Sequence, residues 1–396
     1  MALARHGATA EGGVDRPALS DEDAAARATV REWAAAIGLE PSVDAIGNLF
    51  LRLPGRDPDA PPVLTGSHLD SQPTGGRFDG VYGVLAGLEA VEAIVAAGIR
   101  PRRPIDVVAW TNEEGGRFAP GMMGSAVFAG RRDLSEMLAI EDADGVSVGA
   151  ALEVLLARKG SLSRRPLGGP AAAYIEAHIE QGPVLEAAGF AAGVVTGIQG
   201  KRTFRVTVTG AEAHAGTTPQ GGRKDALSAA VAIIAALEPA MIAGGEAVMF
   251  TIGRLTVAPN VPSVVPAEAV FSIDLRHPES AVLTALGDRI PDLCAAHRGP
   301  CAVRVTALTN EAPLDFPTAL RDLIRAAAGA VAVPVMELTS AAGHDARYLH
   351  QVCPAGMIFV PCHLGISHNV AESAAPGDLA AGARILTAAL LSLADH

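Results

Sequence analysis

The stretch "PIDVVAWTNEEGG", residues 104–116, runs from apolar residues into two adjacent carboxylates, Glu113 and Glu114, and then into two glycines. A short apolar run bounded by proline and glycine is typical of a strand buried within a parallel sheet. A buried carboxylate is costly to leave unpaired, and neighbouring like charges repel each other. The stretch therefore predicts a buried strand whose end carries charges that another group must neutralise.

Two further segments follow the same plan of an apolar strand ending in polar residues. They are "PPVLTGSHLDS" (61–71) and "AAYIEAHIEQGP" (172–183). The intervening residues 79–98 have helical periodicity and end at a glycine. Strands alternating with helices predict an α/β fold, with a three-layer, mostly parallel sheet covered by helices on both faces. In such sheets ligands bind beyond the carboxyl ends of the strands, where these polar residues fall.

The pattern changes after residue 198, which predicts a second domain. Residues 201–210 alternate like a half-exposed strand. The later elements are expected as a helix at 224–240, strands near 248–257 and 267–276, a helix at about 279–298 and a strand at about 301–308. The order β-α-β-β-α-β is that of a ferredoxin-like α+β domain. We therefore expect a catalytic domain of residues 1–198 and 309–396 and an inserted domain of residues 199–308.

Composition narrows the class of partner. The 396 residues carry a formal net charge of −12, which argues against nucleic acid and against an anionic membrane surface. The apolar stretch 226–245 contains Glu238 and Pro239, and a buried amphipathic helix explains it better than a membrane span. The four cysteines form no C-x-x-C pair, and the N-terminus lacks the apolar core of a signal peptide. We expect a cytoplasmic protein with reduced thiols.

Three polar residues of "GSHLDSQPTGGRFDG" (66–80) are candidates for a metal site. His68 and Asp70 alternate at a strand end, so both can point to one side. A metal-bound imidazole usually donates its other N–H to an acceptor such as a carboxylate, a role open to Asp70. Asp79 ends a glycine-containing loop, where its carboxylate could bridge two cations. An isolated H-x-D pair is more often an ordinary exposed pair, so the reading depends on the other clusters.

The pair Glu113–Glu114 offers two roles. Adjacent side chains on extended backbone point in different directions, so one can reach a metal while the other faces a water. A general base needs a carboxylate near the metal but not captured by it. A Glu-Glu pair alone is also typical of a solvated loop.

Two histidines, His178 and His368, complete a ligand set drawn from the whole chain. The candidate metal ligands are His68, Asp79, Glu114, His178 and His368. Nitrogen and oxygen ligands without thiolate suit Zn first, and also Mn, Co or Ni. Five ligands with one bridging carboxylate suit two divalent transition metal ions about 3.5–4 Å apart. Such a pair activates a water and polarises a carbonyl, which indicates hydrolysis.

The chain resembles the M20-type metallohydrolases, and within them the hydantoinase/carbamoylase amidase branch. That branch includes N-carbamoyl-L-amino acid hydrolases, β-ureidopropionases and allantoate amidohydrolases. The resemblance covers nearly the whole chain and rests on "GSHLDSQPTGGRFDG", "TNEEGGRF", "AHIEQGPVLE", "GAEAHAGTTP", "PNVPSVVP", "DLRHP", "TSAAGHDA" and "GISHNVAE". It implies a binuclear catalytic domain and an inserted lid domain through which two chains form a homodimer.

The resemblance also implies roles for single residues. It supports the five metal ligands, with Asp79 bridging, and makes Glu113 the general base and Asp70 the residue that orients His68. The implied substrate-binding residues are Arg276, Asn260, Gln181, His214 and Gly343. Arg276 would clamp a carboxylate, and His214 would stabilise an oxyanion in the partner chain's site. Read without the resemblance, Arg276 is a surface strand residue in a charge pair and His214 a turn residue.

The expected activity is metal-dependent hydrolysis of the carbamoyl C–N bond of N-carbamoyl-L-amino acids, giving amino acid, CO2 and ammonia. An allantoate amidohydrolase or a β-ureidopropionase is the alternative, with an aminoacylase or dipeptidase ranked below them. A non-catalytic binder on this fold would show a broken ligand set. Here all five ligands and the base are present. Ala341, Gln220 and the pair His363–Leu364 depart from the family's usual residues and bear on which substrate fits.

Overall fold

The strand predicted from residues 104–116 is β4 (Ile105–Trp110), and all of its residues are buried. In this computed structural model, which describes residues 1–157 and 162–395, β4 lies in a ten-stranded sheet. The parallel core of that sheet has the order β16-β6-β3-β4. The predicted α/β class is confirmed. Parallel pairing brings the carboxyl ends of the four core strands to one edge.

The outer strands of the sheet run partly antiparallel, which the sequence pattern did not reveal. β2 pairs antiparallel with β4 and with β1, and β7 pairs antiparallel with β16. The strands of the larger unit are β1 (Glu40–Val43), β2 (Leu49–Leu53), β3 (Val63–His68), β4 (Ile105–Trp110), β5 (Ser163–Arg164), β6 (Ala173–Ile179), β7 (Ala192–Ile198), β14 (Leu314–Asp315), β15 (Val335–Ser340) and β16 (Ala355–Val360).

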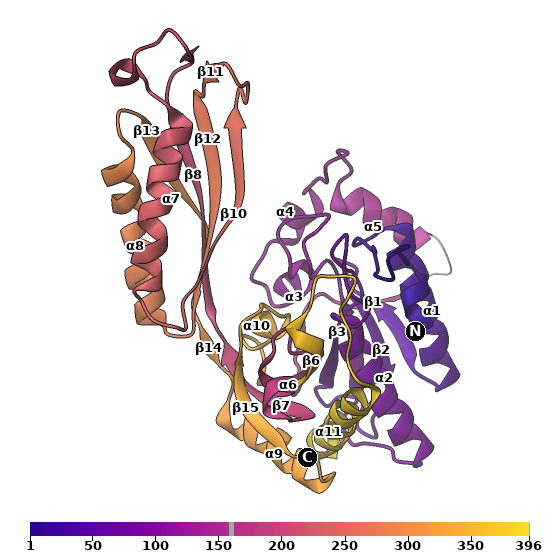
Figure 1. Cartoon of the computed structure of the whole chain (residues 1–396). Coiled ribbons are helices and arrows are strands. Elements are labelled where there is room, and N and C mark those ends of the chain that lie inside the picture. Colours follow the sequence, from indigo (N-terminus) through magenta and orange to yellow (C-terminus); the bar gives the residue numbers. More distant parts are fainter. Residues whose placement is uncertain (158–161, 396) are drawn as a thin grey trace. The chain divides into compact units, whose positions relative to one another are not determined.

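Helices cover the sheet, and α2 and α11 lie side by side on it (Figure 1). Apolar residues of α1, α2, α9 and α11 form one buried cluster with the sheet. Phe128 of α3 packs against Phe50 and Trp110, whose side chains alternate with those facing that cluster. The helices of the larger unit are η1 (Leu3–Arg5), α1 (Asp21–Ala36), α2 (Val81–Ala96), α3 (Met123–Phe128), α4 (Leu134–Leu138), α5 (Val148–Ala157), α6 (Val184–Ala188), α9 (Thr318–Ala330), α10 (Ala346–Leu349), η3 (His363–Gly365) and α11 (Pro376–Asp395).

The C-terminal helix α11 is long and apolar enough to pass a length-and-hydropathy test for a membrane span. Its residues Ile385, Leu386, Ala389 and Leu390 are fully buried in the same cluster as α2 and the central strands. A core helix of an α/β protein passes the same test, and the packing of α11 explains its apolar character.

The chain divides into two compact units, Met1–Gly197 with Asp315–His396, and Ile198–Leu314. The sequence placed the end of the inserted segment at residue 308, which falls inside β13 (Ala302–Glu311). A register shift between Ala307 and Thr309 interrupts the pairing of β13 with β8. Such a shift breaks the alternation by which a strand is recognised, and this explains why the expected strand stopped early.

The smaller unit has a sheet of four antiparallel strands in the order β10-β12-β8-β13. Its elements are β8 (Gly200–Thr209), β9 (Ala213–His214), η2 (Gln220–Gly222), α7 (Ala226–Ile242), β10 (Met249–Ala258), β11 (Val264–Val265), β12 (Glu268–His277), α8 (Ser280–His297) and β13 (Ala302–Glu311). Apart from the short β9–β11 pair, this is the β-α-β-β-α-β order. Alternate residues of β12, including Phe271 and Leu275, are buried in a core shared with α7 and α8. The other β12 side chains, including Arg276, point to the opposite face of the sheet.

Candidate metal centre

The carboxyl edge of the parallel core gathers chemically active side chains from four strands. His68 is the last residue of β3, and His178 is the penultimate residue of β6. Glu113 and Glu114 follow β4, and His368 follows β16 after the short helix η3. The structure thus brings together residues that are far apart in sequence.

The five predicted ligands form two groups of three that share Asp79. In the first group, Asp79 Oδ1 lies 3.2 Å from His178 Nε2 and 3.6 Å from His68 Nε2. In the second, Asp79 Oδ2 lies 3.2 Å from His368 Nε2, which is 3.4 Å from Glu114 Oε2. Each oxygen of one carboxylate therefore faces a different set of side chains, as a bridging ligand requires.

Backbone contacts fix two of the imidazoles. His68 Nδ1 lies 2.9 Å from the carbonyl oxygen of Asp70, and His178 Nδ1 lies 2.8 Å from that of Ile179. A carbonyl oxygen only accepts, so the neutral rings keep their proton on Nδ1. The Nε2 lone pairs then face Asp79, which is the orientation of a metal-ligating histidine.

The electrostatics show that this cluster favours positive charge beside Asp79. Burial alone would raise the pKa of Asp79, but hydrogen bonds with His178, His368 and His68 hold it well below its usual range. Burial opposes protonation of His68, yet Glu113, Asp79 and Asp70 raise its pKa well above the ordinary value. Asp79 raises the pKa of His368 to about 9. Atoms that stabilise protonated imidazoles in this way can equally hold divalent cations, so the donor set fits two metal ions.

Glu113 belongs to neither group of three. Its Oε2 lies 3.5 Å from His68 Nε2, and its side chain is 11% exposed. Burial raises its pKa well above the ordinary value, opposed by His68 and assisted by Asp345 and Glu114. A carboxyl group beside the metal ligands, with an elevated pKa, has the properties of a general base and acid.

Asp70 contacts His68 differently from the sequence prediction. The expected carboxylate contact measures 3.7 Å between His68 Nδ1 and Asp70 Oδ1, whereas the backbone oxygen accepts the hydrogen bond. The Asp70 carboxylate instead accepts from the amides of Glu113 and Glu114, at 3.2 and 3.1 Å. Asp70 therefore ties the end of the His68 strand to the Glu113–Glu114 segment.

Two glutamines each donate a hydrogen bond to the carboxylate of a predicted metal ligand. Gln181 Nε2 donates to Asp79 Oδ2 at 2.8 Å, so the residue predicted to meet substrate contacts the shared carboxylate. Gln72 Nε2 donates to Glu114 Oε2 at 2.8 Å, a contact that the sequence did not predict. The residue lies in the quoted "SHLDSQPTGG" motif, but nothing in the spacing indicates which way an amide points.

The "TSAAGHDA" loop packs against the predicted metal ligand His178. The His344 ring lies edge-on to His178, with ring centroids 4.5 Å apart, and Nε2 is 3.0 Å from Ser340 Oγ. Burial and the neighbouring His178 hold the pKa of His344 well below the ordinary value, so a neutral ring packs there. Gly343, the predicted substrate contact, is exposed next to it. Arg117 Nε pairs with Asp142 Oδ2 at 2.9 Å.

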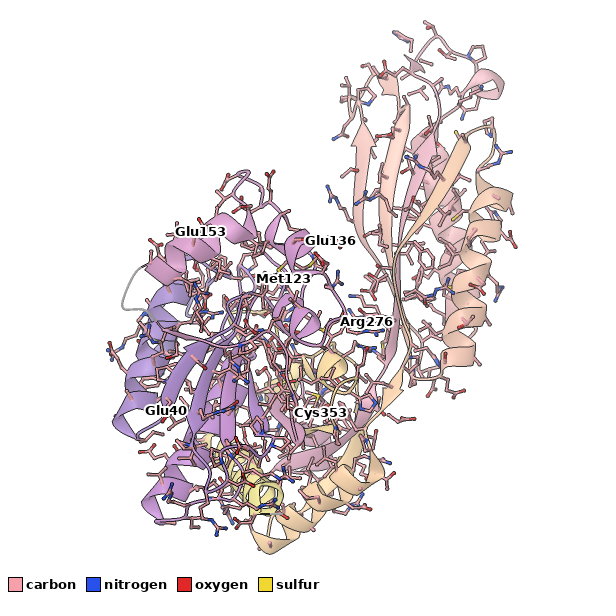
Figure 2. The ribbon with its side chains drawn as sticks, turned by 180° about the vertical axis from the view of Figure 1, so that it is seen from behind. Glu40, Met123, Glu136, Glu153, Arg276 and Cys353 are labelled. Carbon is pink, nitrogen blue, oxygen red and sulfur yellow. The ribbon has the colours of Figure 1, made fainter. Side chains whose placement is uncertain are left out.

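The remaining predicted residues lie in the smaller unit. His214 Nδ1 accepts from the amides of Gly216 and Thr217, which leaves the proton of the neutral ring on Nε2. Arg276, labelled in Figure 2, donates to both oxygens of Asp274 on its own strand, at 2.8 and 3.1 Å. Asn260 has a φ of 59°, a left-handed conformation that asparagine tolerates better than most residues. The structure thus shows the charge pair that was the alternative interpretation of Arg276.

Comparison with known proteins identifies relatives along the whole chain. A family profile described as peptidase family M20/M25/M40 matches residues 64–392. The chain is 41% identical to an N-carbamoyl-L-amino-acid amidohydrolase of Rhizobium meliloti, covering 100% of this chain and 95% of the relative. It is 35% identical to an allantoate amidohydrolase of Bacillus subtilis, covering 99% and 95%. A crystal structure of a hydantoinase/carbamoylase family amidase from Burkholderia vietnamiensis superposes with a TM-score of 0.90 at 44% identity, covering 100% and 96%.

Proposed function

The chain belongs to peptidase family M20/M25/M40 as an amidohydrolase of the hydantoinase/carbamoylase type, and on that premise we propose that it hydrolyses N-carbamoyl-L-amino acids. The bond cleaved is the carbamoyl C–N bond, and the products are the L-amino acid, CO2 and ammonia. The observation that carries this proposal is the pair of three-residue groups around Asp79, with Glu113 beside them.

His68, His178 and Asp79 would hold one divalent transition metal ion, and Glu114, His368 and Asp79 the other. When bound, the two ions would supply Lewis acidity that polarises the scissile carbonyl and acidifies a water. Zn2+ suits these nitrogen and oxygen donors, and Mn2+, Co2+ or Ni2+ are accepted by the same set.

Glu113 moves the proton in the proposed reaction. It takes a proton from the attacking water as the new C–O bond forms at the ureido carbonyl. It then gives that proton to the leaving nitrogen as the C–N bond breaks, which releases the amino acid. The remaining carbamate decomposes to CO2 and ammonia. One carboxyl group serves as base and then as acid, which its elevated pKa favours.

The residues that the family resemblance implies would hold the substrate. We assign the substrate carboxylate to Arg276, because a guanidinium fork matches a carboxylate geometrically. Asn260, Gln181 and Gly343 would contact the ureido and amide groups. The Nε2–H of His214 would stabilise the oxyanion in the second chain of a homodimer, with residues 198–314 acting as lid and dimerisation domain.

Allantoate is the second candidate substrate, and the 35% identical relative from Bacillus subtilis is the observation that favours it. Allantoate and N-carbamoyl-β-alanine share the ureido group and the carboxylate of the first substrate class. N-carbamoyl-β-alanine has one more carbon between those groups, whereas allantoate keeps a single intervening carbon and carries a second ureido group on it.

An assay of the metal-reconstituted protein distinguishes these candidates. Protein loaded with Zn2+ or Mn2+ is incubated separately with N-carbamoyl-L-amino acids, N-carbamoyl-D-amino acids, N-carbamoyl-β-alanine and allantoate, and ammonia and amine release are measured. We expect the highest kcat/KM with an N-carbamoyl-L-amino acid. A higher kcat/KM with allantoate or N-carbamoyl-β-alanine would replace the substrate assignment, and no release from any of them would contradict the proposed function.

We expect Arg276→Ala to lower kcat/KM by about 10- to 100-fold for substrates that carry a carboxylate, the loss typical of removing hydrogen bonds to a charged group. For substrate analogues that carry a carboxamide in place of the carboxylate, kcat/KM should be nearly the same in the variant as in the wild type. Steady-state kinetics with both series measures the difference.

The matched control for this prediction is Arg205→Ala. Arg205 lies on β8 opposite Ser272 of β12, on the same open face of the sheet, and it is exposed. The control should leave both substrate series unchanged. Equal kcat/KM values for Arg276→Ala and wild type on carboxylate substrates would refute the proposed clamp.

A further inference from the structure

Glu372 connects two loops that carry proposed metal ligands, although it belongs to neither group of three. The side chain is 1% exposed. Its Oε1 accepts hydrogen bonds from the backbone amides of Phe78, at 2.8 Å, and Asp79, at 3.1 Å. Its Oε2 accepts from the Ser367 hydroxyl at 2.9 Å. One buried carboxylate therefore holds the backbone of the shared ligand Asp79 and the residue that precedes His368.

These contacts join segments that no regular secondary structure connects. The loop from Ser71 to Gly80 lies between β3 and α2, and His368 lies between η3 and α11. The bonded residues Glu372 and Asp79 are 293 positions apart in sequence. The distances between Asp79 and His368 thus depend on a side-chain bridge across the carboxyl edge of the sheet.

Ser367 makes the bridge continuous with the metal centre. Its Oγ lies 2.9 Å from Glu372 Oε2 and 3.0 Å from Asp79 Oδ2. A hydroxyl has a single proton to donate, so two carboxylates compete for it. Glu372 therefore influences Asp79 in two ways, through the Asp79 amide and through the hydroxyl that faces the Asp79 carboxylate.

The loop has a glycine where Glu372 approaches it. A Cβ atom at Gly76 would lie 2.0 Å from both Cδ and Oε1 of Glu372. A side chain at position 76 would collide with the carboxylate, so the absence of a side chain there makes room for the bridge. The Glu372 carboxylate occupies the space that a side chain at position 76 would need.

We propose that Glu372 is a positioning residue that sets the spacing between the metal ligands Asp79 and His368 by bridging the Asp79 loop to the His368 loop. The inference rests on the proposed function in requiring that these groups bind metal. Replacing partners of this kind, which contact ligands and not the metal, typically costs about 10- to 100-fold in metal affinity or activity. A residue that merely stabilised the fold would affect unfolding without affecting metal affinity in particular.

The test is a Zn2+ titration of chelator-stripped protein in competition with a chromophoric chelator, together with the unfolding temperature of each stripped chain. Glu372→Ala should weaken at least one of the two Zn2+ sites by about 10- to 100-fold. Glu372→Gln should recover most of this loss, because its amide oxygen can still accept from the two backbone amides. Glu372→Asp should not, because a side chain shorter by one methylene cannot span both loops.

Asp106→Asn is the matched control for a loss of buried charge. Asp106 is fully buried near the start of β4, where Arg52 and Arg165 bind it. The control should lower the unfolding temperature and leave both Zn2+ affinities unchanged. Zinc affinities in Glu372→Ala equal to those of wild type would overturn the inference, and so would an equal loss in the control.

Gly76→Ala tests the same bridge with Glu372 present, and it applies even if Glu372→Ala does not fold. The added methyl group should displace the carboxylate and weaken Zn2+ binding, whereas unchanged affinities would contradict the bridge. Wild-type protein that binds no Zn2+ would refute the proposed function itself. Wild-type protein that binds two ions while Glu372→Ala and Gly76→Ala also bind two with equal affinity would refute only the role of Glu372.

Discussion

Glu113→Gln is expected to retain both metal ions and to lower kcat by about 10²- to 10⁴-fold, the usual contribution of a positioned general acid–base. Glutamine has nearly the same size and shape as glutamate, but its amide cannot take a proton from water. Since Glu113 lies outside both groups of three, its replacement leaves the donor atoms in place. Metal analysis and steady-state kinetics on the same preparation measure the two effects separately.

The neighbouring residue provides the control for that prediction. Glu114→Gln removes a charged donor from the group that contains His368, so this variant should lose metal affinity together with activity. The pKa of Glu114 is raised to about 7 by burial and by the nearby Asp79, and a bound cation would favour its ionised form. Near-normal turnover in Glu113→Gln, or full metal retention in Glu114→Gln, would contradict the division of roles between the two residues.

Asp79→Ala is expected to lose both metal ions and to reduce activity to background, because one carboxylate serves both groups of three. Asp79 Oδ1 faces His68 and His178, and Asp79 Oδ2 faces His368. Removing it takes a charged donor from each group and leaves the imidazoles without their common partner. Metal content after dialysis against excess Zn2+ and kcat/KM with an N-carbamoyl-L-amino acid measure the effect.

His178→Ala is the matched comparison, since His178 belongs to only one of the two groups that share Asp79. This variant should retain the ion held by Glu114 and His368 and lose the other. If Asp79→Ala kept two ions per chain, or if both variants lost the same single ion, Asp79 would not be the shared ligand.

The sequence was most informative where a side chain lies at the end of a buried parallel strand. His68 and His178 lie at the ends of β3 and β6, and Glu114 follows β4. Parallel strands place their ends at one edge, so strand positions alone predicted that these residues would meet. The α/β class was predicted from the alternation of strands and helices and the family from its sequence motifs, and both are confirmed.

Contacts that depend on loop geometry were not predictable in this way. His68 has the backbone oxygen of Asp70 as hydrogen-bond partner in place of the expected carboxylate. The direction of the Gln72 and Gln181 amides, and the bridge from Glu372 to the Asp79 loop, depend on backbone paths that hydrophobic periodicity does not encode. The antiparallel strand β1 was missed because it is short and only partly buried.

The central claim is that Asp79 joins two metal-binding groups into one binuclear site, and anomalous X-ray diffraction from crystals of the Zn2+-loaded protein tests it most directly. We expect two anomalous peaks per chain about 3.5–4 Å apart, one beside each oxygen of Asp79. The ion at one peak should be ligated by His68 and His178, and the ion at the other peak by Glu114 and His368. A single peak, or peaks that do not share Asp79, would contradict the claim.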